Sequence, residues 1–545
     1  MLNQEPYTSG GRPAAEARPG AGEAVAGPRV EGEMTWRRAA VAIAVGLALI
    51  LLVALAIRYL EMVTGQYVSH GVPPLPAFAA VLVLSLLRHF LRRRFPRLAP
   101  TRGQILLIYA MLTIGVVLNG GYHVRAFLPH LTALQYLGQD GSGGGSRYAD
   151  YARYLPAWYA PHGEEVIRGY YEGTRSGAIP WDVWLRPVLW WSLFFTAVFL
   201  GVFSLVHLIH RQWIRDEKLA FPLLTLPLAM TAEDWSAYGS RAGRRALFVA
   251  GFAIPAVFNG LNILHALYPS VPEGMGFYVS LADYFPNRPW TPLQSVILFQ
   301  MPEAIGIGYF VPLDVSFSTW VFYLMHRAIA VGGTAAGYDQ PSFPFVQDMG
   351  AGAYIAVGLM LLWGLRRAFK ESFRRAFPGE DRGRRPDLGE RWAWIGLAGS
   401  MVFVLGFCRA AGFSLWLAAP YFAIIGLFVV VYARMRAETG VPFGFMYPYG
   451  LPKEMLLNAV TIPQALAWAG PQSLVLFSSM AWISRHHYAM EQAANQMDSA
   501  KLAEEGAIPR RTLFVALLLA FAVGLAAAFW VHLSTYYDIG SNMAG

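Results

Sequence analysis

The chain has 545 residues, of which 55% are hydrophobic and 14% are charged, and its mean hydropathy is +0.39. Soluble domains carry about 25% charged residues, so this composition excludes an ordinary soluble protein and predicts an all-α, polytopic integral membrane protein. The single cysteine, Cys408, excludes a disulfide framework and a cysteine-based metal site. The net charge of +9 does not predict a nucleic-acid partner, because the basic residues lie in short loops between apolar runs.

Residues 1–33 differ from the rest of the chain in composition. They are rich in Gly, Ala, Pro, Glu and Arg and have almost no bulky apolar residues, which predicts a disordered cytoplasmic tail. Residues 34–545 are predicted to form one helical membrane domain. Its first apolar run follows Arg37 and Arg38 and continues past Ile57, which is too long for the core of a signal peptide.

Nine apolar runs are long enough to cross about 30 Å of hydrocarbon as helices. They cover residues 38–60, 76–91, 104–119, 187–210, 245–264, 350–366, 392–411, 414–434 and 511–532. The distribution of Lys and Arg predicts a protein of the cytoplasmic (inner) membrane with a cytoplasmic N-terminus and an external C-terminus. It also predicts a basic cytoplasmic loop at 366–391 and a cytoplasmic segment at 485–511, in which His486 is solvated.

Two further apolar stretches, 293–333 and 455–484, are interrupted by helix breakers. The breakers are Pro302 and Pro312 in the first stretch and Pro463, Gly470 and Pro471 in the second. Orientation on either side requires an even number of crossings in each, so the total rises to as many as 13. Broken or re-entrant segments in both halves of a chain are typical of a transport site, whereas the alternative is a kinked structural helix.

The predicted external loop at 139–186 opens with a Gly-rich segment and continues with many Tyr and Trp residues. Aromatic rings favour the headgroup level of a membrane. We therefore expect an ordered cap over the outer end of the helices, with a lid over a vestibule as the alternative.

Polar side chains near or within the spans are candidates for solute binding or ion coupling, because ionisable groups there are costly and usually functional. The candidates are Glu303, Asp314, Asn119, His123, Asn259 and Asn262. The alternatives are carboxylates in a solvated loop and amides that only hydrogen-bond between helices. The chain contains no HExxH, GxSxG or Walker A sequence, so no catalytic residue, metal site or cofactor is predicted.

A short motif occurs twice, each time after a span that enters the cytoplasm. It reads "RDEKLAFP" from Arg215 and "RAETGVPF" from Arg436. Arg and Glu two residues apart do not face each other on a helix, so we expect each to pair with a neighbouring element. The shared orientation favours an internal parallel repeat that forms a cytoplasmic gate or hinge, against the alternative of two ordinary helix ends. The gate candidates are Arg215, Glu217, Lys218, Pro222, Arg436, Glu438, Gly440 and Pro442.

The first copy, with Arg211-Gln212-Trp213 before Glu217-Lys218-Leu219-x-Phe221-Pro222, resembles the oligopeptide transporter (OPT) superfamily. Together with "TRGQILLIYAML", "PVLWWSLFF", "VPLDVSFSTWVFYLM" and "RMRAETGVPFG", it is more similar still to an uncharacterised bacterial branch of polytopic membrane proteins. The resemblance covers roughly residues 75–535. It implies a helical secondary transporter, with peptides or metal chelates as the solute class and protons as the coupling ion.

The sequence thus predicts a secondary transporter of a small polar or zwitterionic solute that is not an enzyme. Its partners are the lipid bilayer and the solute, and a homo-oligomer is an open alternative. Two other functions remain open: a non-transporting membrane scaffold or subunit of a larger complex, and an intramembrane enzyme acting on a lipid-linked substrate.

Overall fold

The computed structural model describes most of the chain and shows a helical protein. The described residues are 34–62, 73–139, 145–232, 242–272, 278–299, 302–338, 340–378, 387–440, 447–486 and 488–543. Among them, strands are confined to β1 (Tyr278–Ser280) and β2 (Ile297–Phe299), which pair antiparallel. The predicted all-α membrane fold is therefore confirmed, while the predicted tail at 1–33 lies outside the described residues.

The described part contains nine helical segments long and apolar enough to cross a membrane, as the sequence predicted. They are Trp36–Leu60 (α1), Leu75–Arg94 (α2), Pro96–Gln139, Trp181–Asp216, Ala246–His265, Val346–Ala376 (α13), Leu388–Ala411 (α14), Leu415–Thr439 (α15) and Arg510–Ile539 (α20). The third segment contains α3 (Arg102–Gly115) and α4 (Val124–Gln139), the fourth contains α7 (Trp181–Arg211), and the fifth lies within α10 (Ala242–Leu267).

Nine further helices are too short or too polar to be counted as spans. They are α5 (Gly145–Ala152), α6 (Glu164–Glu172), α8 (Thr225–Met230), α11 (Pro302–Gly308), α12 (Leu313–Ala335), α16 (Leu451–Val460), α17 (Ile462–Met480), α18 (Trp482–Arg485) and α19 (Tyr488–Glu505). The second broken stretch is broken as predicted: Thr461 and Gly470 adopt φ of 66° and 76°, and they interrupt the helices between Leu451 and Met480.

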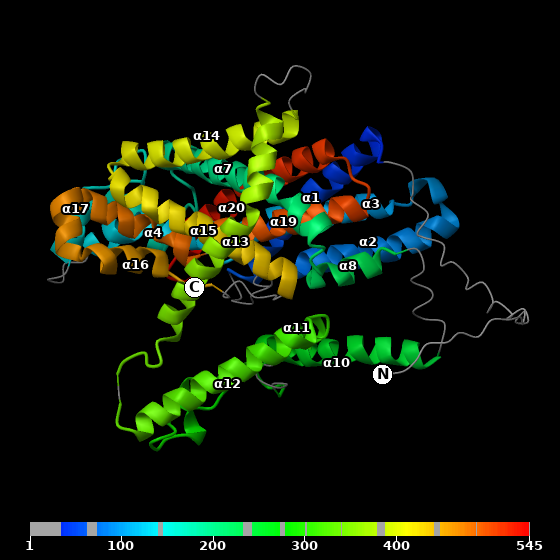
Figure 1. Ribbon diagram of the computed structural model, residues 1–545, viewed down its shortest axis with the longest axis horizontal. Coiled ribbons are helices and arrows are strands. Elements are labelled where there is room, and N and C mark those ends of the chain that lie inside the picture. Colours follow the sequence, from blue (N-terminus) through cyan, green and yellow to red (C-terminus); the bar gives the residue numbers. More distant parts are fainter. Residues whose placement is uncertain are drawn as a thin grey trace, which may run out of the picture.

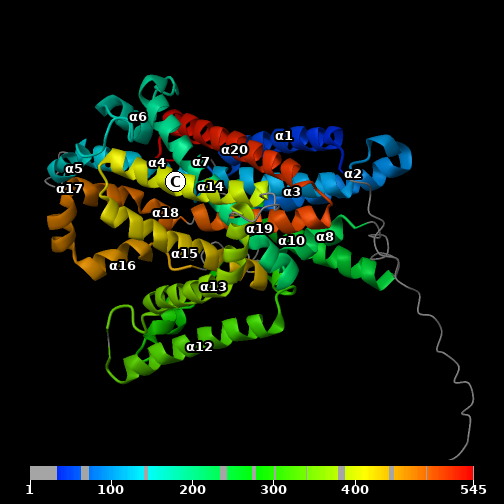
Figure 2. The same ribbon diagram turned by 45° about the horizontal axis from the view of Figure 1, so that its top comes forward.

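The main bundle packs closely around α3, α19 and α20 (Figures 1 and 2). Small residues permit this packing. A Cβ atom added to Gly524 of α20 would lie 2.6 Å from the carbonyl oxygen of Gly115 in α3, so the two backbones are in direct contact. α19 lies inside the bundle against α3, α7 and α15, although its sequence is polar.

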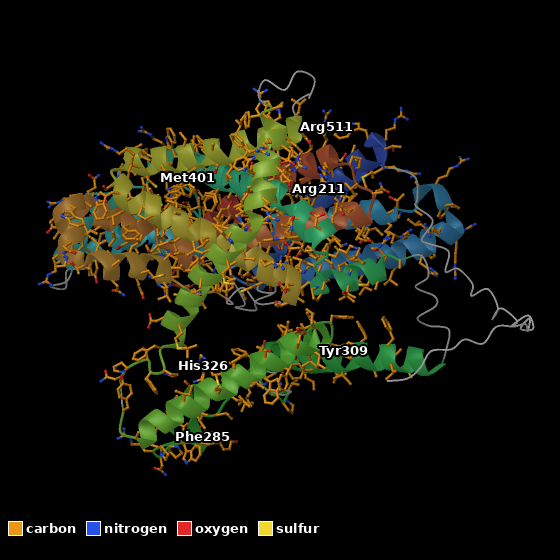
Figure 3. The ribbon with its side chains drawn as sticks, viewed as in Figure 1. Arg211, Phe285, Tyr309, His326, Met401 and Arg511 are labelled. Carbon is orange, nitrogen blue, oxygen red and sulfur yellow. The ribbon has the colours of Figure 1, made fainter. Side chains whose placement is uncertain are left out.

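Helices α10, α11 and α12 form a layer to one side of the bundle, which continues into α13 (Figure 1). Phe285, Tyr309 and His326 lie in this layer, whereas Met401 lies in the bundle (Figure 3). None of the apolar window Ala246–His265 is buried, compared with 89% of the corresponding window in Pro96–Gln139. A lipid-facing position explains such an exposed apolar surface.

Two predicted loops contain helix. α13 continues to Ala376, so much of the predicted basic loop at 366–391 is a helical extension; Asp387 then caps α14 by accepting bonds from the backbone N–H of Gly389 and Glu390. Within 139–186, α5 and α6 fold against α4 and α20. There, burial raises the pKa of the Tyr171 phenol to about 12, so this group stays protonated in its hydrogen bond with Thr132.

Candidate functional site

Three interruptions of helices meet inside the main bundle. The first separates α3 from α4 at residues 120–123, the second precedes α16 at 447–450, and the third separates α18 from α19. The Tyr447 hydroxyl donates to the carbonyl oxygens of Ser484 and Arg485, at 2.7 and 2.6 Å. The rings of Tyr122 and His486 stack with centroids 6.5 Å apart. Segments more than 300 residues apart in sequence therefore form one centre, which we call the break site.

A buried contact between a histidine and a carboxylate lies beside the break site. His123, just before α4, places Nε2 3.2 Å from the Glu491 carboxylate in the first turn of α19, and both side chains are at most 4% exposed. The Tyr488 ring packs edge-on against His123 at 5.6 Å. Burying a carboxylate is costly without partners, and Glu491 has two nearby: the His123 ring and the positive charge of Arg436 on α15.

Polar side chains of α19 continue from this pair through the bundle. Gln492, Asn495 and Ser499 are completely buried. The Asn495 side chain donates to the Thr113 carbonyl at 2.9 Å, while neither polar atom of Gln492 has a hydrogen-bond partner among the described residues. Most of the segment predicted at 485–511 is therefore a helix buried in the bundle, α19. A hydropathy pattern does not predict the burial of α19, because its polar side chains are compensated by partners on neighbouring helices and not by apolar character of its own.

His486 is also not the solvated loop residue that the sequence predicted. Besides Tyr122, its ring lies 5.8 Å from that of His130 and 6.3 Å from that of Tyr449. The residue is only partly exposed, because α4, α16 and α18 converge around it. Arg485, which precedes it, donates from Nε to the Tyr449 hydroxyl at 3.0 Å.

The two copies of the repeated motif pack against each other. The Phe221 N–H donates to the Ala437 carbonyl at 2.8 Å, and a Cβ atom on Gly440 would lie 2.5 Å from Cβ of Pro222. Gly440 has a φ of 66°, which glycine adopts without strain. Both copies therefore lie at the same end of the bundle, as the shared orientation predicted. Lys218, with a φ of 54°, lies in the turn between α7 and Pro222, and Pro442 lies outside the described residues.

Arg434 joins the acidic residues of both motifs. It forms ion pairs with Glu217, from the other copy, and with Glu438, one turn further along α15 at 2.9 Å. Its guanidinium also lies 5.5 Å from the centroid of the Trp213 ring. The contact between the copies is thus electrostatic as well as steric. We call Glu217, Arg434 and Glu438 the motif triad.

The arginines of both motifs bind α19. Arg436 pairs with Asp498 at 3.1 Å in a fully buried contact, and Arg215 pairs with Glu504 at 2.9 Å near the end of the helix. As the spacing predicted, neither arginine pairs with the glutamate two residues after it. α19 therefore links the break site, through Glu491, to the motif contact, through Asp498 and Glu504.

The structure brings only some of the predicted solute candidates to the break site. His123 is at its centre. Asn119 is nearby, but its side chain donates to the carbonyls of Gly115 and Gly524, which fits the alternative of helix-to-helix bonding. The other four lie in the layer of α10–α12: Asn259 and Asp314 are exposed, Asn262 is half-exposed, and the Glu303 side chain lies outside the described part.

The most important missed residues are Glu491, Gln492, Asn495 and Asp498. The only local signal for them is a helix-forming run from Tyr488 to Glu505 without Gly or Pro. Among the described residues, no three His, Cys, Asp or Glu side chains are grouped so that they could hold a metal ion.

Comparison with known proteins identifies one family. The model of a family of unknown function (DUF6785) matches residues 31–545. No curated protein and no solved structure matches the chain.

Proposed function

We propose that this chain, which belongs to the DUF6785 family of unknown function, is a secondary transporter of a small polar or zwitterionic solute. The observation that carries the proposal is the break site. Non-helical backbone within a membrane bundle is tolerated only where protein buries it or where it lines a cavity. Discontinuous helices that meet within the bundle are the usual construction of a solute site in secondary transporters.

The polarity of α19 favours transport over a scaffold. A scaffold needs only tight packing, which an apolar helix supplies. Here the buried helix carries Glu491 and Asp498, each paired with a basic residue from another helix. Buried ion pairs add little to stability compared with apolar residues of similar volume, so their presence is better explained by a role in binding or coupling.

The motif contact is suited to act as a gate at one end of the bundle. Separation of the two copies would break the Arg434–Glu217 ion pair of the motif triad and release Pro222 from Gly440. The same movement would pull on α19 through Arg215 and Arg436. In this mechanism the gate and the break site move together, because one helix connects them. We assign the gate to the cytoplasmic side, following the positive-inside rule.

Proton coupling would use His123 and Glu491. The two groups can share one proton, and binding a second proton at the carboxylate would remove the charge attraction between them. The neighbouring groups that bear on this pair are Tyr488, His486 and, on α15, Arg436. Solute binding that displaces His123 from Glu491 would then change proton affinity, which is the requirement for coupling.

Uptake into proteoliposomes tests the proposal. Labelled amino acids, di- and tripeptides and metal chelates would be offered with and without an imposed pH gradient. We expect uptake of at least one class, driven by the gradient and lost in Glu491→Gln. The control is Glu165→Gln, an exposed residue of α6, which should transport as the unaltered chain does.

Accessibility supplies a test that does not depend on the choice of solute. A cysteine replacing the buried Gln492, in a Cys408→Ala background, should react with a small thiol reagent in membranes if the break site opens. A folded protein that shows neither uptake nor reaction at position 492 would overturn the proposal.

A further inference from the structure

Three helices begin at the break site. α4 begins at Val124, α16 at Leu451 and α19 at Tyr488, and the residues just before each are in mutual contact. Helix N-termini carry partial positive charge and favour anions. One helix, α18, ends here, but its last carbonyls accept bonds from the Tyr447 hydroxyl, which offsets their negative end.

Basic side chains gather at the same place. They are His130 of α4, Lys453 of α16, Arg485 of α18 and His486, and together with Tyr449 they form a cluster of side chains that we call the anion pocket. Lys453 donates to the Ser478 hydroxyl at 3.2 Å, and Arg485 donates to the hydroxyl of Tyr449. Neither cation pairs with a described carboxylate. The adjacent acid, Glu454, is exposed, and Glu491 is held by His123.

One buried polar atom of this cluster lacks a hydrogen-bond partner in the described part of the chain. Nδ1 of His486 is inaccessible and has no hydrogen-bond partner among the described residues, although the ring lies between those of Tyr122, His130 and Tyr449. Arg485 and Tyr449 are exposed, so a ligand can reach these two side chains of the cluster. Lys453 and Arg485 lie close enough to repel each other, and an anionic group bound between them would relieve this repulsion.

We infer that the solute carries an anionic group, a carboxylate or a phosphate, and that this group binds in the anion pocket. That the bound anion belongs to the transported solute rests on the proposed transport function. The binding itself follows from the geometry of the pocket. Arg485 supplies a planar donor suited to a carboxylate or phosphate, Lys453 supplies a second charge, and the aromatic rings wall the site.

Binding to the full chain in detergent tests the inference. Inorganic phosphate and succinate would be titrated at constant ionic strength while the midpoint of thermal unfolding is recorded, with choline chloride as the cation control. We expect a saturable rise with at least one of the two anions. Arg485→Gln and Lys453→Gln should each weaken apparent affinity by about tenfold, since each removes a charge-assisted hydrogen bond.

The matched control is Arg409→Gln, which removes an exposed cation at the end of α14. It should bind the anion as the unaltered chain does. The inference is overturned if neither anion raises the midpoint, or if Arg409→Gln weakens binding as much as the pocket variants.

Failure of the inference is distinguishable from failure of the transport proposal. Saturable anion binding in a protein that moves no solute would support the anion pocket and overturn the transport proposal. Uptake could instead occur without inhibition by phosphate or succinate and without impairment by Arg485→Gln. That result would support the transport proposal and overturn the inference that the solute carries an anionic group.

Discussion

Arg434 and Arg436 lie two residues apart on α15 and face opposite environments. Arg434 is partly exposed and binds the two motif glutamates, whereas Arg436 is 3% exposed and binds Asp498. An exposed ion pair contributes roughly 0–1 kcal/mol to stability. Removing one partner of a buried pair costs about 3–5 kcal/mol, because the other charge stays buried without compensation. The two arginines should therefore respond differently to loss of their partners.

Asp498→Asn should destabilise the protein strongly. The expected loss in the free energy of unfolding is about 3–5 kcal/mol, measured by chemical unfolding in mixed micelles. The matched control is Asp538→Asn, which breaks the exposed Arg58–Asp538 pair; that pair is at 3.2 Å, compared with 3.1 Å for Arg436–Asp498. Its cost should stay below about 1 kcal/mol. Equal costs for the two variants would show that Arg436 is not a desolvated charge.

Glu217→Gln and Glu438→Gln, made separately, should impair uptake without blocking folding. Each variant removes one carboxylate from Arg434 in a solvent-accessible contact, so stability should change by less than about 1 kcal/mol. Uptake should fall because Glu217→Gln removes the ion pair between the two copies, whereas Glu438→Gln removes the carboxylate that holds Arg434 in place from one turn further along α15. The control is Glu165→Gln. If both motif variants transport normally, the two stretches are helix ends and not a gate.

At the level of elements, the end of α15 packs against the segment after α7 through one glycine, Gly440. Gly440 combines a positive φ with direct contact to the ring of Pro222. Any side chain at this position meets both a strained backbone conformation and the carbon atoms of a rigid ring. The contact between the two motif copies therefore depends on the absence of a Cβ atom.

Gly440→Ala should push the two copies apart. We expect a loss of at least about 1–3 kcal/mol in the free energy of unfolding from the backbone conformation alone, together with weaker closure of the gate. The control is Gly426→Ala, within the α15 helix that Gly440 follows, because a Cβ atom on Gly426 meets nothing within 4 Å. It should be neutral or stabilising by up to about 1 kcal/mol. Similar unfolding midpoints for the two variants would contradict the packing of Gly440 on Pro222.

Over the whole molecule, the bundle has two distinct ends. One end holds the motif contact and the start of α20, and the other holds α6, the Arg58–Asp538 pair and the end of α20. Helix α19 connects the interior, through Glu491, to the first of these ends, through Glu504.

Single cysteines should report these two ends separately. Arg511→Cys and Glu165→Cys are exposed positions at opposite ends. The native Cys408 is fully buried, so its background reaction should be small. In intact cells an impermeant maleimide should label position 165 and not position 511, and permeabilisation should reveal position 511. Labelling of both positions from one side would contradict the arrangement of the bundle.

The nine spans, the two broken stretches and the repeated motif could be read from the order of residues. Each depends on properties within a few turns of chain: the hydropathy of about 20 residues, a proline or glycine, or a motif beside basic residues. The folded bundle was needed to place α19 in the core, to bring the three helix interruptions together and to set α10–α12 aside. Burial of a polar helix is decided by partners such as His123 and Arg436, which lie elsewhere in the sequence. Their pairing with Glu491 and Asp498 exists only after the chain has folded.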